Sequence, residues 1–595
     1  MDRRDGILAG LLGAGLVAWL LPVVNYGVDP HHDGIMLKPA LDVLSGQVLF
    51  RETFTQYGAL TTYLQVAALG VHPSLLSLRF MAVAAYAGAL LFYYAAWRLI
   101  LPRSLAALAC GLFLLFIPSY EKNWLGEYWL MLPWSSVFAL MLQGVGLYAL
   151  FRVIRDERAA QWGLVLGMAC AGTFWCRQPV GVIMTGCVGA SWLALQWAGW
   201  APANTPTHAI LRRILAGFVL INALLLGGIL ATGALPEWWY QNFVWPTKWA
   251  QESENVNWNL FVTFFVHPRT AISLLALLLA ASAPALAQRH GFPSTPRRLA
   301  VYYLGFAGVL AWQHDWVLNT LALRDGGWSA LFPVIIMLQA LASLTAVFQK
   351  SSTPRTTEYY LVAALAAVAL GSLVQYYPVP DPWHVVWSLA PGFGLVVFVL
   401  WRCSRWPAPV LALVLLAAFL PAVWAKVRSA RQMLDQPMTT LAEPAALRGM
   451  RVTSAQAQSF HQIMRLLALI QRYQPNAPSA LIGNDALFLC LTDNHANPSP
   501  YYVTWINLAS PAENQRRWDY IQHVRPVMFL HKARWDAVND FYRRARYLPL
   551  LYLSDDALEI AVPQELAATM GLKAYGFTAD GPPAKPAAPA SEAKP

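Results

Sequence analysis

The segment from Asn25 to Leu60, NYGVDPHHDGIMLKPALDVLSGQVLFRETFTQYGAL, directly follows the first long apolar run of the chain, positions 7 to 24. It contains three aspartates, a glutamate, two adjacent histidines, a lysine and an arginine, although only 12% of the 595 residues are charged. Soluble domains carry about 25% charged residues. A preceding run of membrane-spanning length places this charged segment at a membrane surface, and we expect the chemistry of the protein there.

The remaining sequence is dominated by apolar runs, with 57% hydrophobic residues. At about 20 residues per helix it predicts about thirteen membrane spans. The expected spans are 7 to 24, 78 to 100, 104 to 118, 131 to 152, 160 to 176, 179 to 198, 210 to 232, 270 to 287, 299 to 316, 328 to 347, 359 to 375, 385 to 401 and 408 to 424. The predicted fold class is mainly α, a polytopic membrane helical bundle with a small C-terminal α/β extracytoplasmic domain.

Arginines and lysines gather in alternate connections between the expected spans, beginning with Arg3 and Arg4. By the positive-inside rule these connections and the N-terminus are cytoplasmic, so the Asn25 loop lies on the outer, periplasmic face of a bacterial inner membrane. The same bias accounts for the net charge of +11, and nucleic acid is not implied. The six cysteines form no C-x-x-C pair and predict no disulfide framework.

Three parts are expected along the chain: a transmembrane domain, 1 to 425, with its first outer loop at 25 to 77; an extracytoplasmic α/β domain, 426 to 577; and a disordered tail, 578 to 595. Within the second part, 452 to 473 has the apolar spacing of a helix. Positions 480 to 482 and 527 to 530 are typical of short buried strands, and 535 to 547 of a second amphipathic helix.

Two carboxylates in Val28-Asp-Pro-His-His-Asp-Gly34 are the candidate catalytic groups. Asp29 precedes Pro30 and is well suited to cap a helix, which is as good an interpretation as a catalytic one. Asp33 lies one turn later, so both carboxylates would project from one helix face. Either could take the proton of an acceptor hydroxyl as its oxygen attacks.

The same cluster raises the question of a metal. Asp29, His31, His32 and Asp33 could hold a divalent cation such as Mg or Mn, but adjacent histidines point in different directions on a helix. No cofactor is certain from the sequence.

Other polar residues near expected helix ends are candidates for substrate binding. The second outer loop holds Glu121 and Glu127, of which the second lies closer to the next span. Arg177 and Lys248 could grip a phosphate or simply reach lipid headgroups, and His384 and His32 could contact substrate.

The chain resembles the GT-C superfamily of integral-membrane glycosyltransferases, which includes protein O-mannosyltransferases and lipid A aminoarabinose transferases. The resemblance rests on DPHHDG and SGQVLFRETFTQYGAL in the first outer loop, on the many spans, and on LFLCLTDNHANPSPYY in the C-terminal part. It implies a polyprenyl-phosphate-linked sugar donor and a glycan, lipid or protein acceptor. It also implies a base in the first outer loop, best matched by Asp33 and then by Asp29.

The resemblance further implies a second acid at Glu127 or Glu121, and phosphate-binding cations at Arg177 and Lys248. The superfamily often has adjacent acids, whereas this chain has Asp-Pro-His-His-Asp. Two alternatives stay open: a transporter or flippase of lipid-linked glycans, and an O-antigen polymerase or ligase.

Overall fold

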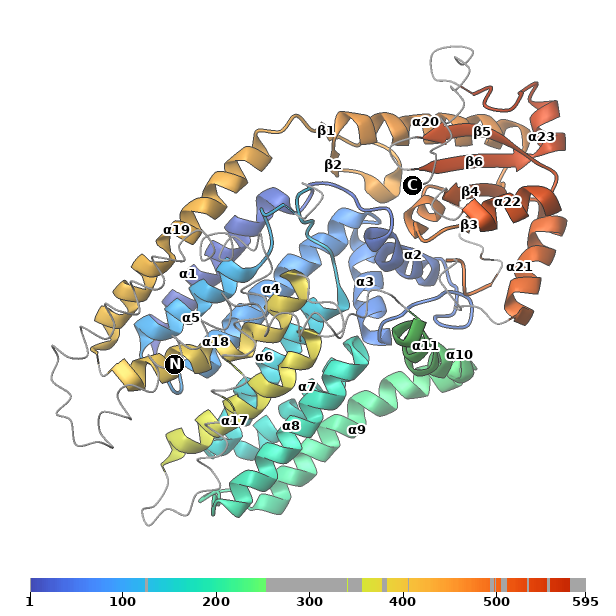
Figure 1. Ribbon diagram of the computed structural model, residues 1–595. Coiled ribbons are helices and arrows are strands. Elements are labelled where there is room, and N and C mark those ends of the chain that lie inside the picture. The colour runs from blue at the N-terminus through green and yellow to red at the C-terminus, as the bar shows by residue number, and fades with distance from the viewer. Residues whose placement is uncertain are drawn as a thin grey trace, which may run out of the picture.

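The computed structural model describes residues 2–122, 127–252, 336, 340, 356–376, 382–404, 406–492, 497, 499–503, 511–531, 535–553 and 557–577. Within these ranges, seven helices are long and apolar enough to cross a membrane, or eight if a bent pair at 408–434 counts as one span. This is the architecture of a multi-pass membrane protein. The helices pack side by side, and the C-terminal domain sits at one end of the bundle (Figure 1).

The bundle follows the expected spans closely. Its helices are α1 (Arg3–Leu20) with η1 (Leu21–Val23), α4 (Leu75–Trp97), α5 (Arg103–Phe116), α6 (Ser135–Ile154), α7 (Ala159–Cys176), α8 (Gln178–Trp197), α9 (Thr207–Ala231), α17 (Thr357–Ser372) with η3 (Leu373–Tyr376), α18 (Pro382–Ser404) and α19 (Ala408–Leu434). The helix α5 has 14 residues and is short for a span. The spans expected at 270 to 287, 299 to 316 and 328 to 347 lie outside the described residues, apart from two positions.

Short helices lie between the bundle and the C-terminal domain. They are α2 (His32–Leu44) and α3 (Ala59–Val71) in the first loop, and α10 (Leu235–Trp239), η2 (Tyr240–Val244) and α11 (Trp245–Glu252) after α9. The first two occupy the space directly beneath the C-terminal domain (Figure 1). The charged loop is thus enclosed between two folded parts.

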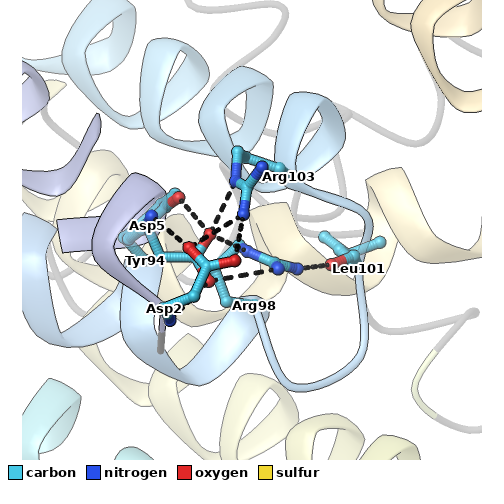
Figure 2. A network of polar contacts seen from close by, with 6 residues as sticks. All are labelled: Asp2, Asp5, Tyr94, Arg98, Leu101 and Arg103. Carbon is cyan, nitrogen blue, oxygen red and sulfur yellow. Dashed lines mark hydrogen bonds and ion pairs between the residues drawn. The ribbon is translucent and has the colours of Figure 1, made fainter. Parts of the chain in front are cut away.

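A buried carboxylate ties the N-terminal end of α1 to the C-terminal end of α4 and the N-terminal end of α5 (Figure 2). Asp5 on α1 accepts hydrogen bonds from Nε of Arg98, at 2.9 Å, and from Nε of Arg103, at 2.8 Å. Arg103 also pairs with Asp2, whose side chain accepts the backbone N–H of Asp5 and caps α1. The charges of the amino-terminal segment therefore fix α1 against α5 and the end of α4.

The C-terminal domain has a four-stranded sheet in the order β3-β4-β6-β5. The strands are β3 (Ser479–Ile482), β4 (Val527–His531), β5 (Tyr547–Leu553) and β6 (Leu558–Pro563), and β3 and β4 run parallel while the other pairs are antiparallel. Alternate side chains of β4 point to opposite faces. Val527 and Phe529 join the core that contains α20 (Ser454–Tyr473), whereas Met528 and Leu530 face α21 (Pro511–Val524) and α22 (Trp535–Arg544).

The remaining elements of this domain are β1 (Thr439–Thr440), β2 (Arg451–Val452), η4 (Ala445–Leu447), η5 (Ala486–Cys490) and α23 (Gln564–Thr569). The expected helix at 452 to 473 and both expected strands are confirmed. The second amphipathic helix ends at Arg544, and Tyr547 begins β5 instead. The helix α19 continues to Leu434, beyond the expected end of its span at 424, and the tail from 578 lies outside the described residues.

The C-terminal domain contacts the first loop through η5, which crosses α2. At Gly34, a Cβ atom would lie 2.2 Å from the backbone nitrogen of Leu487, so this approach requires glycine. The Leu487 N–H donates to the carbonyl of Pro30 at 3.1 Å. The start of α2 is therefore held by the backbone of the C-terminal domain.

Candidate active site

Asp29 caps the first turn of α2. Its Oδ1 accepts the backbone N–H groups of His31, at 2.9 Å, and His32, at 2.8 Å. Its Oδ2 lies 2.7 Å from Nδ1 of His32. The capping role expected for Asp29 is therefore confirmed, and the same carboxylate also holds an imidazole.

These contacts decide the protonation of Asp29. Burial raises the pKa of its carboxyl, but the hydrogen bonds and charge of His32 outweigh burial, and the net pKa lies well below the ordinary value. Because a carboxylate can only accept hydrogen bonds, Nδ1 of His32 carries a proton. The side chain of His32 is 40% exposed and that of Asp29 31% exposed, so this pair faces solvent.

Asp33 lies in a different environment from Asp29. Its side chain is fully buried, and its Oδ2 lies 2.6 Å from a terminal nitrogen of Arg79 on α4, which is also fully buried. The same Oδ2 accepts the backbone N–H of Asp29 at 2.9 Å, and Arg79 donates to the carbonyl of Tyr26 at 2.8 Å. Burial raises the pKa of the Asp33 carboxyl, and the Arg79 guanidinium opposes that rise. This ion pair fixes the start of the loop to the bundle.

His31 points towards the C-terminal domain. Its Nδ1 donates to the carbonyl of Asn484 at 3.0 Å. Burial lowers the pKa of this imidazole to about 4, so the ring is neutral at physiological pH. His31 therefore anchors the loop and carries no charge into the site.

Aromatic rings lie beside the Asp29 and His32 pair. The ring of Trp134, which precedes α6, lies 5.2 Å from that of His32 and 5.8 Å from that of Tyr57, in both cases edge to face. Trp134 also contacts Trp387 of α18, at 6.4 Å between ring centroids. These three residues, Tyr57, Trp134 and Trp387, form what we call the aromatic wall.

Arg177 and His384 lie at the other end of the aromatic wall. Arg177 occupies the break between α7 and α8, where its extended backbone ends one helix and begins the next. Its guanidinium lies 5.7 Å from the centroid of Trp387, donates to Ser136, and lies 3.3 Å from Nε2 of His384. These three contacts orient the guanidinium. Its charge also opposes the rise that burial causes in the pKa of Tyr57.

The structure thus brings together four of the residues singled out in the sequence: Asp29, His32, Arg177 and His384. The aromatic wall that joins them was missed, since tryptophan and tyrosine at the ends of spans are expected as interfacial anchors in any case. A Pro-Trp pair directly before a span was the available signal for Trp134, and it is weak.

The described contacts of Glu121 and Lys248 are with other residues. Glu121 is 2.6 Å from Nζ of Lys426, which also donates to two carbonyls at the end of α5, so this acid ties the second loop to α19. Glu127 is exposed. Lys248 is exposed on α11 with Nζ 5.5 Å from the ring centroid of Tyr240. Roles for these three in substrate binding stay predictions.

No group of three or more His, Cys, Asp or Glu side chains in the described ranges has the arrangement of a metal site. In the expected cluster, Asp29 and His32 bind each other, Asp33 pairs with Arg79, and His31 is turned to Asn484. In the described part of the chain these four residues make other contacts, and the Mg or Mn ion considered from the sequence stays a prediction.

No protein-family model and no curated protein sequence matches the chain. Solved structures are similar in fold. One is the oligosaccharyltransferase of Archaeoglobus fulgidus tethered to an acceptor peptide, with a TM-score of 0.47 and 11% identity over 95% of this chain and 74% of that one. Another is ArnT from Cupriavidus metallidurans bound to undecaprenyl phosphate, with a TM-score of 0.42 and 12% identity over 94% and 98%.

The archaeal enzyme with zinc and sulfate has a TM-score of 0.43 and 12% identity, and the match covers 86% of this chain but only 61% of that one. These similarities concern the fold alone.

Proposed function

We propose that this protein is a membrane glycosyltransferase that moves a hexosyl or pentosyl group from a polyprenyl-phosphate carrier to an acceptor hydroxyl. The acceptor is a glycan, lipid or protein of the cell envelope. The reaction takes place on the periplasmic face of a bacterial inner membrane, with the N-terminus of the chain in the cytoplasm. One observation carries the proposal: Asp29 and His32 lie at one end of the aromatic wall, and Arg177 and His384 lie at the other.

The cationic end suits the phosphate of such a donor. A guanidinium offers a planar set of N–H donors that matches phosphate oxygens, and Trp387, Ser136 and His384 hold that of Arg177 in place. Arg177 also lies at the N-terminus of α8, where the partial positive charge of a helix favours an anion. When the bond between sugar and phosphate breaks, negative charge grows on the phosphate, and fixed donors stabilise it.

The Asp29 and His32 end suits the acceptor. An acceptor hydroxyl must lose its proton as its oxygen attacks the sugar, so a basic group has to lie within hydrogen-bond reach. Of the aromatic wall, Trp387 and Tyr57 are buried and Trp134 is half-buried, so Trp134 is the ring that can meet the apolar face of a sugar between the two ends. We assign the fully buried Asp33 to holding the loop, and we place the basic function at Asp29 and its bound imidazole.

The test is donor turnover by the purified full-length protein in lipid nanodiscs. The donors are radiolabelled hexoses, pentoses and aminoarabinose, each linked to undecaprenyl phosphate, and the readouts are label transfer to envelope lipids or peptides and release of undecaprenyl phosphate. We expect the parent to release the carrier from at least one donor. Arg177→Met should lower kcat/KM by about 10²–10³ because it removes charge stabilisation from the leaving phosphate.

Arg472→Met is the matched control, because Arg472 is exposed in the last turn of α20. It should turn over donor as the parent does. Binding of every donor without release of undecaprenyl phosphate would contradict the proposal and favour a transporter or flippase.

A further inference from the structure

The Asp29 and His32 pair can be assigned separate roles. Resting on the proposed function, we propose that Nε2 of His32 is the atom that takes the proton of the acceptor hydroxyl, and that Asp29 is a positioning residue for this imidazole. The assignment follows from the contacts of Asp29. One of its carboxylate oxygens accepts hydrogen bonds from the backbone at the start of α2, and the other accepts one from the ring of His32.

Asp29 is a poor proton acceptor in this setting. Its Oδ1 accepts two backbone N–H groups at 2.9 and 2.8 Å, and its Oδ2 accepts Nδ1–H of His32 at 2.7 Å. Each of these hydrogen bonds stabilises the charged form and weakens its basicity. To take a proton, Asp29 would have to give up a helix cap or release the imidazole.

Asp33 is also a poor proton acceptor. Its side chain is fully buried against Arg79, and the oxygen nearest the loop already accepts the N–H of Asp29. An acceptor substrate could reach it only if the start of α2 came away from α4. Neither of the two carboxylates in the segment is therefore suited to meet a hydroxyl.

His32 has the properties that both carboxylates lack. Its Nδ1 is the donor to Asp29, so in the neutral ring the lone pair is on Nε2. Its side chain is 40% exposed, and its ring packs against that of Trp134. A carboxylate on Nδ1 also stabilises the imidazolium that forms when Nε2 takes a proton.

The step balances as follows. The O–H bond of the acceptor breaks and its proton goes to Nε2 of His32, while the acceptor oxygen forms a bond to the anomeric carbon. The bond from that carbon to the phosphate oxygen breaks, and the polyprenyl phosphate leaves with the electron pair beside Arg177. The imidazolium then returns its proton to water.

The pH dependence of the rate separates this assignment from a carboxylate base. In the described part of the chain, the titratable and charged groups around His32 come from three places. Its own segment contributes Asp29, His31 and Asp33, and the aromatic wall contributes Tyr57, with Arg177 and His384 beyond it. The C-terminal domain contributes Asp485 and His531, next to His31. His31 stays neutral above about pH 4. A base at His32 predicts that kcat/KM falls on the acid side as its imidazole takes up a proton, and His31 does not contribute to that fall.

The experiment compares the parent, His32→Ala, Asp29→Asn and His31→Gln by release of undecaprenyl phosphate across pH 4.5 to 8.5. In Asp29→Asn the amide can still cap α2, but its NH₂ group faces Nδ1 and favours the tautomer with the proton on Nε2. We expect both His32→Ala and Asp29→Asn to lose about 10²–10⁴ in kcat/KM, a range typical of losing a general base. The pH profile of His32→Ala should lack the imidazole limb, which is the fall in kcat/KM on the acid side caused by protonation of the imidazole. The rate of this variant should rise with added imidazole.

His31→Gln is the matched control, because it removes the neighbouring imidazole and should keep the limb. Persistence of the limb in His32→Ala, or wild-type turnover by that variant, would overturn the assignment. Rescue of Asp29→Gly by formate, with no effect of imidazole on His32→Ala, would place the base at Asp29 instead. If the parent releases undecaprenyl phosphate from no donor, the proposed function fails, and this assignment fails with it.

Discussion

Replacing Asp33 tests whether this residue is structural or chemical. Its carboxylate pairs at 2.6 Å with Arg79, and both side chains are fully buried. Removing one partner of a buried ion pair leaves an uncompensated charge and costs about 3–5 kcal/mol. Total stabilities of domains are about 5–15 kcal/mol, so Asp33→Leu or Arg79→Met alone should lower the melting temperature markedly.

The double variant Asp33→Leu/Arg79→Met allows a more definite estimate of the stability loss. Replacing both partners by apolar groups of similar size removes the buried charge, so its cost reduces to the other hydrogen bonds that are lost. These are the acceptor for the N–H of Asp29, at 2.9 Å, and the donor to the carbonyl of Tyr26, at 2.8 Å. At about 1 kcal/mol each, the double variant should lose about 2 kcal/mol, less than either single variant.

The assay is thermal unfolding in detergent, followed by the fluorescence of the 26 tryptophans, with donor turnover measured on the same samples. The double variant should therefore lose clearly less stability than the sum of the losses of the two single variants. The conservative variant Asp33→Asn decides the role of the residue. If it melts as the parent does and still releases no undecaprenyl phosphate, Asp33 acts in the chemistry and our assignment of it to structure is wrong.

Three further predictions concern contacts around the site. Gly34→Ala should lower the free energy of unfolding by about 1–3 kcal/mol, because its Cβ would clash with the backbone of η5. It should also raise the protease sensitivity of the C-terminal domain. The control Gly70→Ala should be neutral, because no atom lies within 4 Å of its Cβ. The folded-state pKa of His31, about 4, lies below the ordinary value of about 6.5. The contribution of its neutral ring to the free energy of unfolding is therefore complete above pH 6.5 and is lost as the pH falls towards 4. The melting temperature of the parent should fall over that range by more than that of His31→Gln. Lys426→Met should lower stability by leaving Glu121 buried without its partner at 2.6 Å, and adding Glu121→Leu should restore part of the loss, while KM for the donor stays that of the parent.

Much of the fold could be predicted because it depends on local patterns. Apolar runs placed the helices of the bundle within a few residues, and short β-rich segments placed β3 and β4. Asp29 before Pro30 predicted the cap of α2. The extension of α19 to Leu434 was missed, since the helix continues with a polar surface after its apolar run ends.

The roles of the two aspartates could not be predicted, because they depend on partners far away in the chain. Arg79 lies 46 positions from Asp33, one turn into a spanning helix, and neither residue carries a local sign of the other. The same holds for Arg177 and His384, which are 207 positions apart. Sequence patterns indicate which residues are candidates, while contacts across the fold decide which of them face one another.

The C-terminal domain borders the first loop directly. Four residues between Gly27 and His31 hydrogen-bond to it: the N–H of Gly27 donates to the carbonyl of Arg451, the carbonyls of Val28 and Pro30 accept from the side chain of Gln456 and the N–H of Leu487, and the ring of His31 donates to the carbonyl of Asn484. Asp29 lies within this run, so the position of its carboxylate, and of the imidazole it orients, follows the position of the domain. A small displacement of η5 relative to α4 would therefore move His32 against Trp134 while Arg177, held by α7, α8 and α18, stays in place. The position of His32 relative to Arg177 therefore depends on how the C-terminal domain docks on the first loop.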